Sequence, residues 1–532
     1  MLDKKNKGSY YTPKIIADFM VNYLSEKLKD KTSLDILEPS SGDGIFIRTL
    51  YNHFTLSSKL NKVVAVEREE TELEKVKKIT QNGSLNTIHS DFLEFQKTDD
   101  RKFDLVIGNP PYIKKNRLSE GQIELCENIH KSFSQLSDKK IKNIWTAFLV
   151  RSISFIKDDG CLALVLPSEL LQVKFAEELR SLILDEFERV EIFTFNELLF
   201  KDCKGQDTLL LIAERKSDKK GTYYTNIEKV TDLETKKFSL TQNIKSKESK
   251  WTHSHLESDE IELLENLKPK LVEIDELCSS KAGIVTAANN YFIVNAETIK
   301  KYSLQEYIKP IIQKGVFVNG SVELNDTDFQ KLINASKPTY LIALNDDITT
   351  HNEELMQYLA IGEEALLHER FKMKKRDKWY KVPNIGTPPE AFFFKRCNEY
   401  PKLIKNNAKV LATDSAYTIG MKDDFNIDNL IFSFYNSLTL SLAELNGRYY
   451  GGGVLELTPN EFKGLSVPYV NTNPNEFNTF VGAFKDKSSI KEICKRNDLR
   501  ILKTIDKDLN SDAIEKIYNI REKLYLRRIK TN

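Results

Sequence analysis

The feature that most constrains the fold is an alternation of short apolar runs with helix-like segments in the first half of the chain. Short runs in which apolar residues predominate are typical of strands buried on both faces. Strands of this kind that alternate with helices predict a doubly wound, mostly parallel α/β sheet with helices on both faces. The helix-like segments include residues 71–78, 144–156 and 168–188. The apolar runs are residues 34–37, 63–66, 85–88, 103–108, 161–166 and 207–213.

The character of the chain changes after residue 213. Residues 214–251 are rich in Lys, Thr and Ser, and from about Leu256 onward Gly, Pro and aromatic residues are scattered without a strand–helix rhythm. A chain of 532 residues is long enough for two or three domains. We therefore expect a first domain over residues 1–250 and an α+β domain over 251–532, with a helical tail from about residue 476.

Composition excludes several classes of protein. The start of the chain is polar, and no apolar run approaches the ~20 residues that a membrane span needs. None of the six cysteines forms a CxxC pair, which argues against a zinc site or a disulfide framework. We expect a cytoplasmic protein with reduced thiols, no bound metal and no membrane partner. The net charge of +1 neither indicates nor excludes a nucleic-acid partner, because only the local field attracts a polyanion.

A glycine-containing turn follows the first predicted strand. Residues 38–44 read Glu-Pro-Ser-Ser-Gly-Asp-Gly and precede a helical stretch. Glycines at such a strand-to-helix turn let the backbone approach a ligand closely. The third glycine of the dinucleotide fingerprint is absent, so this loop alone predicts no more than a tight turn.

Two acidic residues at later strand ends strengthen the interpretation. Glu67 follows Gly42 by 25 residues, close to the spacing at which an acidic residue binds a ribose in Rossmann-like folds. A carboxylate accepts hydrogen bonds from both ribose hydroxyls. Asp91 follows the third strand, where its carboxylate can accept from the amino group of an adenine ring. In this order the two acids predict a nucleoside site, and S-adenosylmethionine is such a nucleoside.

The most specific motif is Asn109-Pro110-Pro111-Tyr112, directly after the fourth strand. Prolines fix φ and remove backbone donors, so the turn holds carbonyl oxygens without competing N–H groups. These carbonyls and the Asn109 side-chain oxygen can accept both protons of an –NH₂ group. The amine lone pair is then oriented toward an incoming methyl group, and positioning and electrostatics supply most of the rate. The Tyr112 ring offers a surface for a base to stack on.

Together these motifs resemble the gamma-class N6-adenine DNA methyltransferases of bacterial restriction–modification systems. The resemblance implies a Rossmann-like, seven-stranded methyltransferase domain followed by a target-recognition domain. It implies site-specific methyl transfer from S-adenosyl-L-methionine to N6 of an adenine flipped out of double-stranded DNA, because an amine inside a stacked duplex is out of reach. We expect a monomer that acts as an orphan methylase or as a modification enzyme beside a separately encoded restriction endonuclease.

The resemblance also assigns individual residues. Asn109 and the Pro110 carbonyl would bind the target amine, while Tyr112 and Phe200 would stack on the two faces of the flipped base. Thr12 ends an N-terminal segment that in such enzymes packs over the methionine moiety of the cofactor, and Glu38 would lie near the same moiety. In chain order, the expected cofactor-binding residues are Tyr11, Thr12, Glu38, Ser40, Gly42, Glu67, Asp91 and Asn109.

Three segments of the second half are also similar to the specificity domains of these enzymes. Residues 283–292, Gly-Ile-Val-Thr-Ala-Ala-Asn-Asn-Tyr-Phe, have alanine at position 287 where glycine is frequent. Residues 411–415 and 449–457 are similarly familiar. Residues 372–380 form the densest basic–aromatic stretch, which is equally consistent with phosphate contacts and with a solvated loop.

Other readings stay open at this point. Protein-glutamine methyltransferases share Asn-Pro-Pro-Tyr but lack the roughly 280 residues that follow the linker here. RNA adenine requires the same chemistry, whereas cytosine amines are more often met by Ser-Pro-Pro-Tyr. A binding subunit without catalysis is disfavoured because catalytic and recognition parts share one chain. Only seven residues precede Gly8, and no nuclease motif is evident later, so we expect no DNA cleavage.

Overall fold

The structure is a computed structural model. It describes residues 11–79, 83–95, 102–136, 141–197, 199–200, 207–243, 251, 256–318, 320–344, 353–450 and 453–529. Contacts divide the chain into a unit over Met1–Ser258, with two short later segments, and a unit over Asp259–Tyr449 and Val454–Arg528. We propose that these units are the two domains expected from the sequence.

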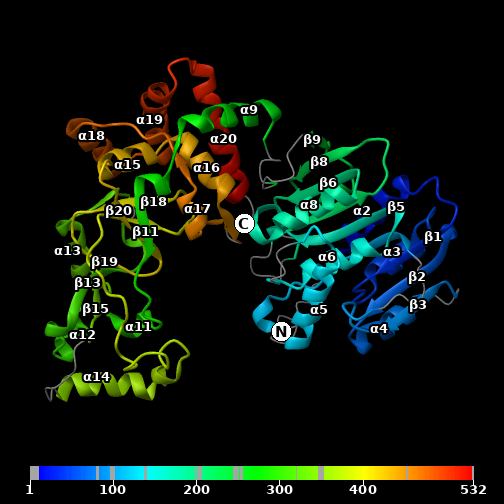
Figure 1. Cartoon of the computed structure of the whole chain (residues 1–532), viewed down its shortest axis with the longest axis horizontal. Helices are drawn as coiled ribbons and strands as arrows, with labels where there is room; N and C mark the ends of the chain where they lie inside the picture. Colours follow the sequence, from blue (N-terminus) through cyan, green and yellow to red (C-terminus); the bar gives the residue numbers. More distant parts are fainter. Residues whose placement is uncertain are drawn as a thin grey trace. The chain divides into compact units, whose positions relative to one another are not determined.

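The first unit is built on a nine-stranded sheet in the order β3-β2-β1-β4-β5-β7-β6-β8-β9 (Figure 1). Neighbours from β3 to β5 are parallel, and β7 runs antiparallel to both β5 and β6. The predicted Rossmann-like methyltransferase sheet is confirmed, and β8 and β9 extend it past β6. The strands are β1 (Leu34–Glu38), β2 (Leu60–Glu67), β3 (Leu85–His89), β4 (Phe103–Gly108), β5 (Ile156–Pro167), β6 (Arg189–Phe195), β7 (Thr208–Glu214), β8 (Gly221–Ile227) and β9 (Thr241–Asn243).

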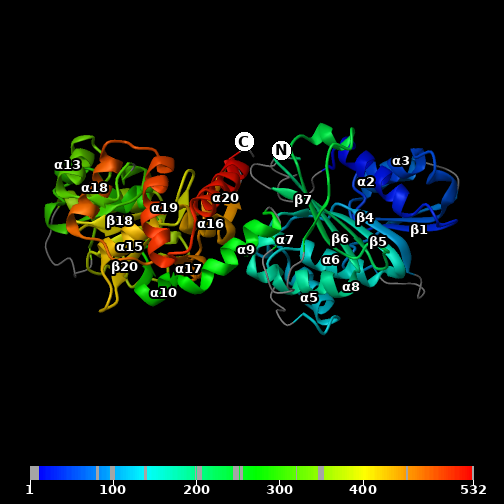
Figure 2. The ribbon, with the colours of Figure 1, turned by 90° about the horizontal axis from the view of Figure 1, so that it is seen from above.

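Helices cover both faces of this sheet, as the alternation of apolar runs predicts (Figure 2). Successive side chains of a strand point to opposite faces. Residues 161, 163 and 165 of β5 therefore join one apolar core with α2 and α3, while 162, 164 and 166 join another with α6 and α8. The helices are α2 (Lys14–Lys27), α3 (Ile45–Asn52), α4 (Glu70–Lys77), α5 (Glu120–Lys131), α6 (Trp145–Ser154), α7 (Glu169–Gln172) and α8 (Glu177–Glu186).

The single helix expected over residues 168–188 is wrong in detail. Val173 has extended backbone angles, which separate α7 from the segment that leads into α8. Strand β6, which follows, escaped the search for apolar runs because polar residues interrupt its pattern. Arg189 and Glu191 are both buried within it, and the Arg189 Nε donates to Glu191 Oε1 at 2.6 Å. A buried ion pair thus replaces apolar side chains at two positions of the strand.

The second unit combines small sheets with a helical end. Its larger sheets have the orders β11-β20-β16-β18-β14 and β12-β15-β13-β19. The strands are β10 (Val272–Glu273), β11 (Cys278–Ala282), β12 (Ile293–Val294), β13 (Ile308–Ile312), β14 (Glu323–Leu324), β15 (Tyr340–Ile342), β16 (Ala391–Phe394), β17 (Arg396–Cys397), β18 (Lys402–Asn406), β19 (Leu411–Ala412), β20 (Ala416–Met421), β21 (Arg448–Tyr450), β22 (Val454–Glu456) and β23 (Ser466–Val467). The helices are α9 (Ser258–Leu267), α10 (Ile274–Leu277), α11 (Asn289–Phe292), α12 (Ala296–Lys301), α13 (Asp326–Asn334), α14 (Glu353–Glu364), α15 (Ile427–Phe434), α16 (Ser437–Asn446), α17 (Pro459–Lys463), α18 (Pro474–Lys485), α19 (Ile490–Ile505) and α20 (Ser511–Ile529).

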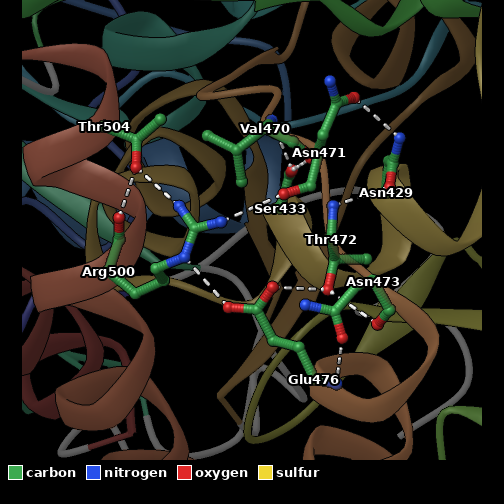
Figure 3. Close-up of polar contacts among 9 residues, drawn as sticks. All are labelled: Asn429, Ser433, Val470, Asn471, Thr472, Asn473, Glu476, Arg500 and Thr504. Carbon is green, nitrogen blue, oxygen red and sulfur yellow. Dashed lines mark hydrogen bonds and ion pairs between the residues drawn. The ribbon is translucent and has the colours of Figure 1, made fainter.

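A polar network holds residues 470–473, just before α18, against α15 and α19 (Figure 3). The backbone N–H of Val470 donates to Ser433 Oγ of α15 at 2.9 Å. That of Thr472 donates to Asn429 Oδ1 of the same helix at 2.9 Å. Arg500 of α19 donates to Glu476 Oε1 at 2.9 Å and to the carbonyl oxygen of Asn471 at 3.1 Å. These polar groups satisfy one another, so we interpret the cluster as structural.

A buried carboxylate joins α19 to α16. Asp498 is 1% exposed and accepts hydrogen bonds from the backbone N–H of Ser437 at 2.7 Å and from its hydroxyl. Burial raises the pKa of Asp498 to about 6, and the Ser437 donors and the charge of Arg521 only partly oppose this rise. The folded protein therefore holds this proton at a pH where the unfolded chain has released it.

This proton predicts a pH dependence of stability. Because the folded pKa is raised, stability falls as the pH rises from about 4 to about 6, by about 3 kcal/mol for two pKa units. We expect the Asp498→Asn variant, which cannot ionise there, to lose this part of the dependence. Urea unfolding of both proteins between pH 4 and pH 7 checks it. If the free energy of unfolding changed with pH in the same way for both proteins, the role of Asp498 would be contradicted.

Candidate active site

The turn between β1 and α3 needs both of its glycines. Gly42 and Gly44 have φ of +51° and +80°, a region that other residues rarely adopt. A Cβ on Gly44 would lie 2.6 Å from Ile79 Cδ1, so the Ile79 side chain would have to shift to make room for it. The Tyr11 ring lies beside Gly42, whose added Cβ would be 3.9 Å from Tyr11 Cε1. The backbone of this turn is thus exposed to a ligand beneath an aromatic ring.

The carboxylate of Glu67 braces this turn from the end of β2. Its Oε2 accepts from the N–H of Gly42 at 2.7 Å, and its Oε1 accepts from the N–H of Glu69 at 2.8 Å. Strand order explains the convergence, because β1 and β2 are parallel neighbours and their carboxyl ends meet at one edge of the sheet. Each carboxylate oxygen keeps further acceptor capacity, as the ribose role predicted for Glu67 requires.

Glu38 is buried at the end of β1. Its side chain is 1% exposed, and its Oε2 has no hydrogen-bond partner among the described residues. Burial, followed by the negative charges of Glu67 and Asp43, raises the pKa of Glu38 well above its usual range. A buried carboxyl oxygen without a hydrogen-bond partner fits a cationic ligand group that brings the missing interaction.

Asp91 lies at the carboxyl end of β3, as predicted. Its Oδ1 accepts from the N–H of Leu93 at 2.9 Å, and Arg68 Nη1 lies 3.8 Å from its Oδ2. The next residue, Phe92, packs against Phe148 of α6 with ring centroids 5.2 Å apart. A carboxylate therefore stands at the border of an apolar wall, an arrangement that suits a purine ring with an exocyclic amine.

Hydrogen bonds fix the orientation of the Asn109 side chain after β4. Its Nδ2 donates to Thr12 Oγ1 at 3.2 Å, and its Oδ1 accepts from the Tyr112 hydroxyl at 2.9 Å. The same hydroxyl lies 3.0 Å from the carbonyl oxygen of Val165. The backbone carbonyl of Asn109 accepts from Ser40 Oγ at 3.0 Å. A carbonyl oxygen has two lone pairs, so the amide oxygen can accept from more than one donor.

These elements surround a cavity of about 240 Å³ at the carboxyl edge of the sheet. Six of the predicted residues line it, and Thr12 reaches it through its hydrogen bond to Asn109. The predicted residues that line the cavity are Tyr11, Ser40, Gly42, Glu67, Asp91 and Asn109.

Besides Thr12, four predicted residues do not line this cavity. Glu38 and Pro110 are buried, and each is next in sequence to a residue that lines the cavity. Tyr112 and Phe200 belong to the apolar cores on opposite faces of the sheet. Tyr112 and Phe200 are 8% and 6% exposed, so neither ring is presented to solvent in this conformation. Their stacking on a target base stays a prediction, as do the other residue roles.

The cavity also contains residues that the sequence did not reveal. Ile144 and Phe148 extend the apolar wall, and Arg117 and Gln122 add polar groups from the loop after the tetrapeptide and from α5. Helix α6 is buried along most of its length, so its periodicity could not show which side faces a ligand. Phe92 had the clearest signal, since it directly follows Asp91.

In the part of the chain that the structure describes, no group of three or more His, Cys, Asp or Glu side chains could hold a metal ion. No described helix is both long and apolar enough to cross a membrane.

Comparisons with known proteins match both halves of the chain. The family model described as Eco57I restriction-modification methylase matches residues 27–200, and that of the Type II methyltransferase M.Eco57I C-terminal domain matches 248–502. Type II methyltransferase M.AccI of Acinetobacter calcoaceticus is 23% identical over 96% of this chain and 95% of its own. M.BstVI of Geobacillus stearothermophilus is 21% identical over 77% of this chain and 80% of its own.

Solved structures show the same fold. The Type IIL restriction-modification enzyme MmeI, in complex with DNA, has a TM-score of 0.63 at 12% identity, covering 96% of this chain and 76% of that one. The DrdV–DNA complex has a TM-score of 0.53 at 13% identity, covering 91% of this chain and 57% of that one. The sheet of the first unit thus belongs to a methyltransferase fold. The two parts of the chain thus match family models of restriction–modification methyltransferases, the first over residues 27–200 and the second over residues 248–502.

Proposed function

We propose that this chain methylates DNA, transferring a methyl group from S-adenosyl-L-methionine to N6 of an adenine flipped out of the duplex. The observation that carries the proposal is the Asn109 amide, held by Thr12 and Tyr112 at the border of a cavity that also contains Glu67 and Asp91. A nucleoside site and an oriented acceptor for an amine thus share one cavity. The restriction–modification family models that match the chain support DNA as the substrate.

The residues present fit S-adenosylmethionine. Glu67 would accept from the ribose hydroxyls, and Asp91 would accept from the adenine amine beside the wall of Phe92 and Phe148. The Oε2 oxygen of Glu38, which has no hydrogen-bond partner among the described residues, suits the positively charged methionine end. When bound, the cofactor supplies a methyl group made electrophilic by its sulfonium.

The chain itself orients the target amine. Asn109 Oδ1 and the Pro110 carbonyl would accept its two protons, which directs the nitrogen lone pair away from them. Asn109 is neutral and a poor base, so the proton leaves after the nitrogen has reacted, and water can take it. Preorganised acceptors of this kind lower the barrier without reorganising during the reaction.

The proposal is tested by incubating the purified protein with bacterial DNA and radiolabelled S-adenosylmethionine, then digesting the DNA to nucleosides. We expect label in N6-methyladenine. Label in N4-methylcytosine would instead identify the exocyclic amine of cytosine as the target. Label only in RNA or in protein, offered in parallel reactions, would overturn DNA as the substrate.

The Tyr112 hydroxyl is expected to act as a positioning group for Asn109. Replacing Tyr112 with Phe keeps the ring but removes the donor 2.9 Å from Asn109 Oδ1. We expect kcat to fall roughly tenfold, the worth of one hydrogen bond of about 1.4 kcal/mol, with KM for the cofactor unchanged. Steady-state kinetics check this split. An unchanged kcat would leave Tyr112 with only the role of its ring.

A further inference from the structure

The second unit contains a hollow of about 1010 Å³. It lies where α11, α12 and α14 come together at one end of this unit (Figure 1). Three segments that the sequence singled out contribute to its lining, although they are far apart in the chain. Asn290 comes from residues 283–292, Lys372 from the start of the basic–aromatic stretch and Asp414 from residues 411–415.

Two arginines hold one wall of the hollow in a strained shape. Ala287 has φ of +64°, which is unfavourable for a residue with a Cβ. Its carbonyl accepts from Arg370 Nη1 at 3.1 Å, and the carbonyl of Thr286 accepts from Arg376 Nη2 at 2.8 Å. Strained backbone that side chains hold in place clusters at functional sites.

An aromatic cluster makes the neighbouring wall rigid. Tyr291 stacks on Tyr358 of α14 with ring centroids 4.8 Å apart, and its hydroxyl donates to the Tyr358 carbonyl at 2.9 Å. Trp379 packs so closely on α14 that a Cβ at Gly362 would lie 2.2 Å from its ring. The basic–aromatic stretch is thus anchored to the hollow by its tryptophan, which argues against a freely solvated loop.

Side chains in the hollow offer hydrogen-bonding groups that the protein does not use itself. No hydrogen bond or ion pair is found for the side chains of Asn290, Lys372 or Asp414 within the ranges that the structure describes. Between two cations of the lining lies Phe371, which is 73% exposed.

The chemistry of these groups matches double-stranded DNA. An asparagine amide pairs with the N6 and N7 edge of adenine, and an aspartate accepts from N4 of cytosine. A lysine or arginine neutralises phosphate or contacts guanine. Amide, carboxylate and ammonium groups together in one rigid hollow are therefore suited to reading base edges beside a phosphate backbone.

We propose that this hollow reads the target sequence in duplex DNA, with Asn290 and Asp414 contacting base edges and Lys372 contacting phosphate. The inference rests on the proposed function, because it names the surface that selects the DNA on which the cavity of the first unit acts. Arg370 then has a positioning role, since its guanidinium supports the strained wall.

The phosphate contact is tested by DNA binding at several salt concentrations. Lys372→Gln should weaken binding to all duplexes alike and reduce the slope of log K against log salt by about 1. Lys507→Gln is the matched control, because Lys507 is exposed on the same unit but outside the hollow. An unchanged slope in the Lys372 variant would overturn this contact.

The base contacts are tested by sequencing methylated DNA from cells that express the full chain. Asn290→Ala and Asp414→Asn should each relax one position of the methylated sequence, with discrimination falling roughly 5- to 150-fold there. Cofactor binding and the unfolding temperature should stay unchanged, which separates lost readout from misfolding. If both variants methylate the same DNA sequence as the active unaltered protein, this inference is overturned while the proposed function stands. An unaltered protein that methylates no DNA overturns the proposed function as well.

Discussion

Replacing Asn109 with alanine is expected to lower the rate of methyl transfer about 100- to 1,000-fold, with a much smaller effect on cofactor affinity. The substitution removes the side-chain oxygen that would accept from the target amine, together with the hydrogen bonds to Thr12 and Tyr112. Loss of one preorganised group of this kind typically costs a factor of about 10²–10³ in kcat. Single-turnover transfer of labelled methyl groups measures this loss, and calorimetry measures cofactor affinity in parallel.

A matched control uses another asparagine of the same unit. Asn86 is exposed on β3 and does not line the cavity, so Asn86→Ala should retain full activity. Asn109→Asp keeps an acceptor oxygen but loses the donor to Thr12, and we expect activity between the two extremes. Wild-type rates in the Asn109→Ala protein would remove the tetrapeptide from the mechanism.

The first unit was largely predictable because its decisive signals are local. A strand buried on both faces can be recognised in the sequence from its own apolar residues. Parallel neighbouring strands then bring the residues after their carboxyl ends to one edge of the sheet. Gly42, Glu67, Asp91 and Asn109 therefore line one cavity, as their positions after successive strands predicted. Strand β6 was missed because Arg189 and Glu191 compensate each other's charge inside the fold, and such compensation is invisible in a pattern of apolar residues.

Other features depend on contacts that no local pattern encodes. The partner of the Tyr112 hydroxyl at Val165 comes from β5, 53 residues later, so the sequence showed a ring but not the role of its oxygen. The sequence assigned Ile144 and Phe148 to a helix but could not show which side of that helix faces the cavity. In the second unit the motifs were recognisable one at a time, but their meeting around one hollow follows only from tertiary packing.

Glu67 combines two roles that a substitution can separate. In the structure it accepts from the amides of Gly42 and Glu69, and in the proposed complex it also accepts from the ribose hydroxyls. Glu67→Gln replaces one acceptor oxygen with a donor that faces another donor. Since a hydrogen bond to a charged group contributes about 1.5–3 kcal/mol, we expect cofactor affinity to fall roughly 10- to 100-fold.

The ribose contact can be isolated with a cofactor analogue that lacks one ribose hydroxyl. If Glu67 binds the ribose, the unaltered protein should bind the analogue more weakly than the cofactor, while Glu67→Gln should discriminate little between the two. The coupling between residue and hydroxyl is the difference of these effects, and it excludes the contribution of Glu67 to the turn itself. Glu70→Gln, an exposed residue at the start of α4, serves as the matched control. Equal discrimination by the Glu67 variant and the unaltered protein would assign Glu67 to bracing the glycine turn, with the ribose bound elsewhere in the cavity.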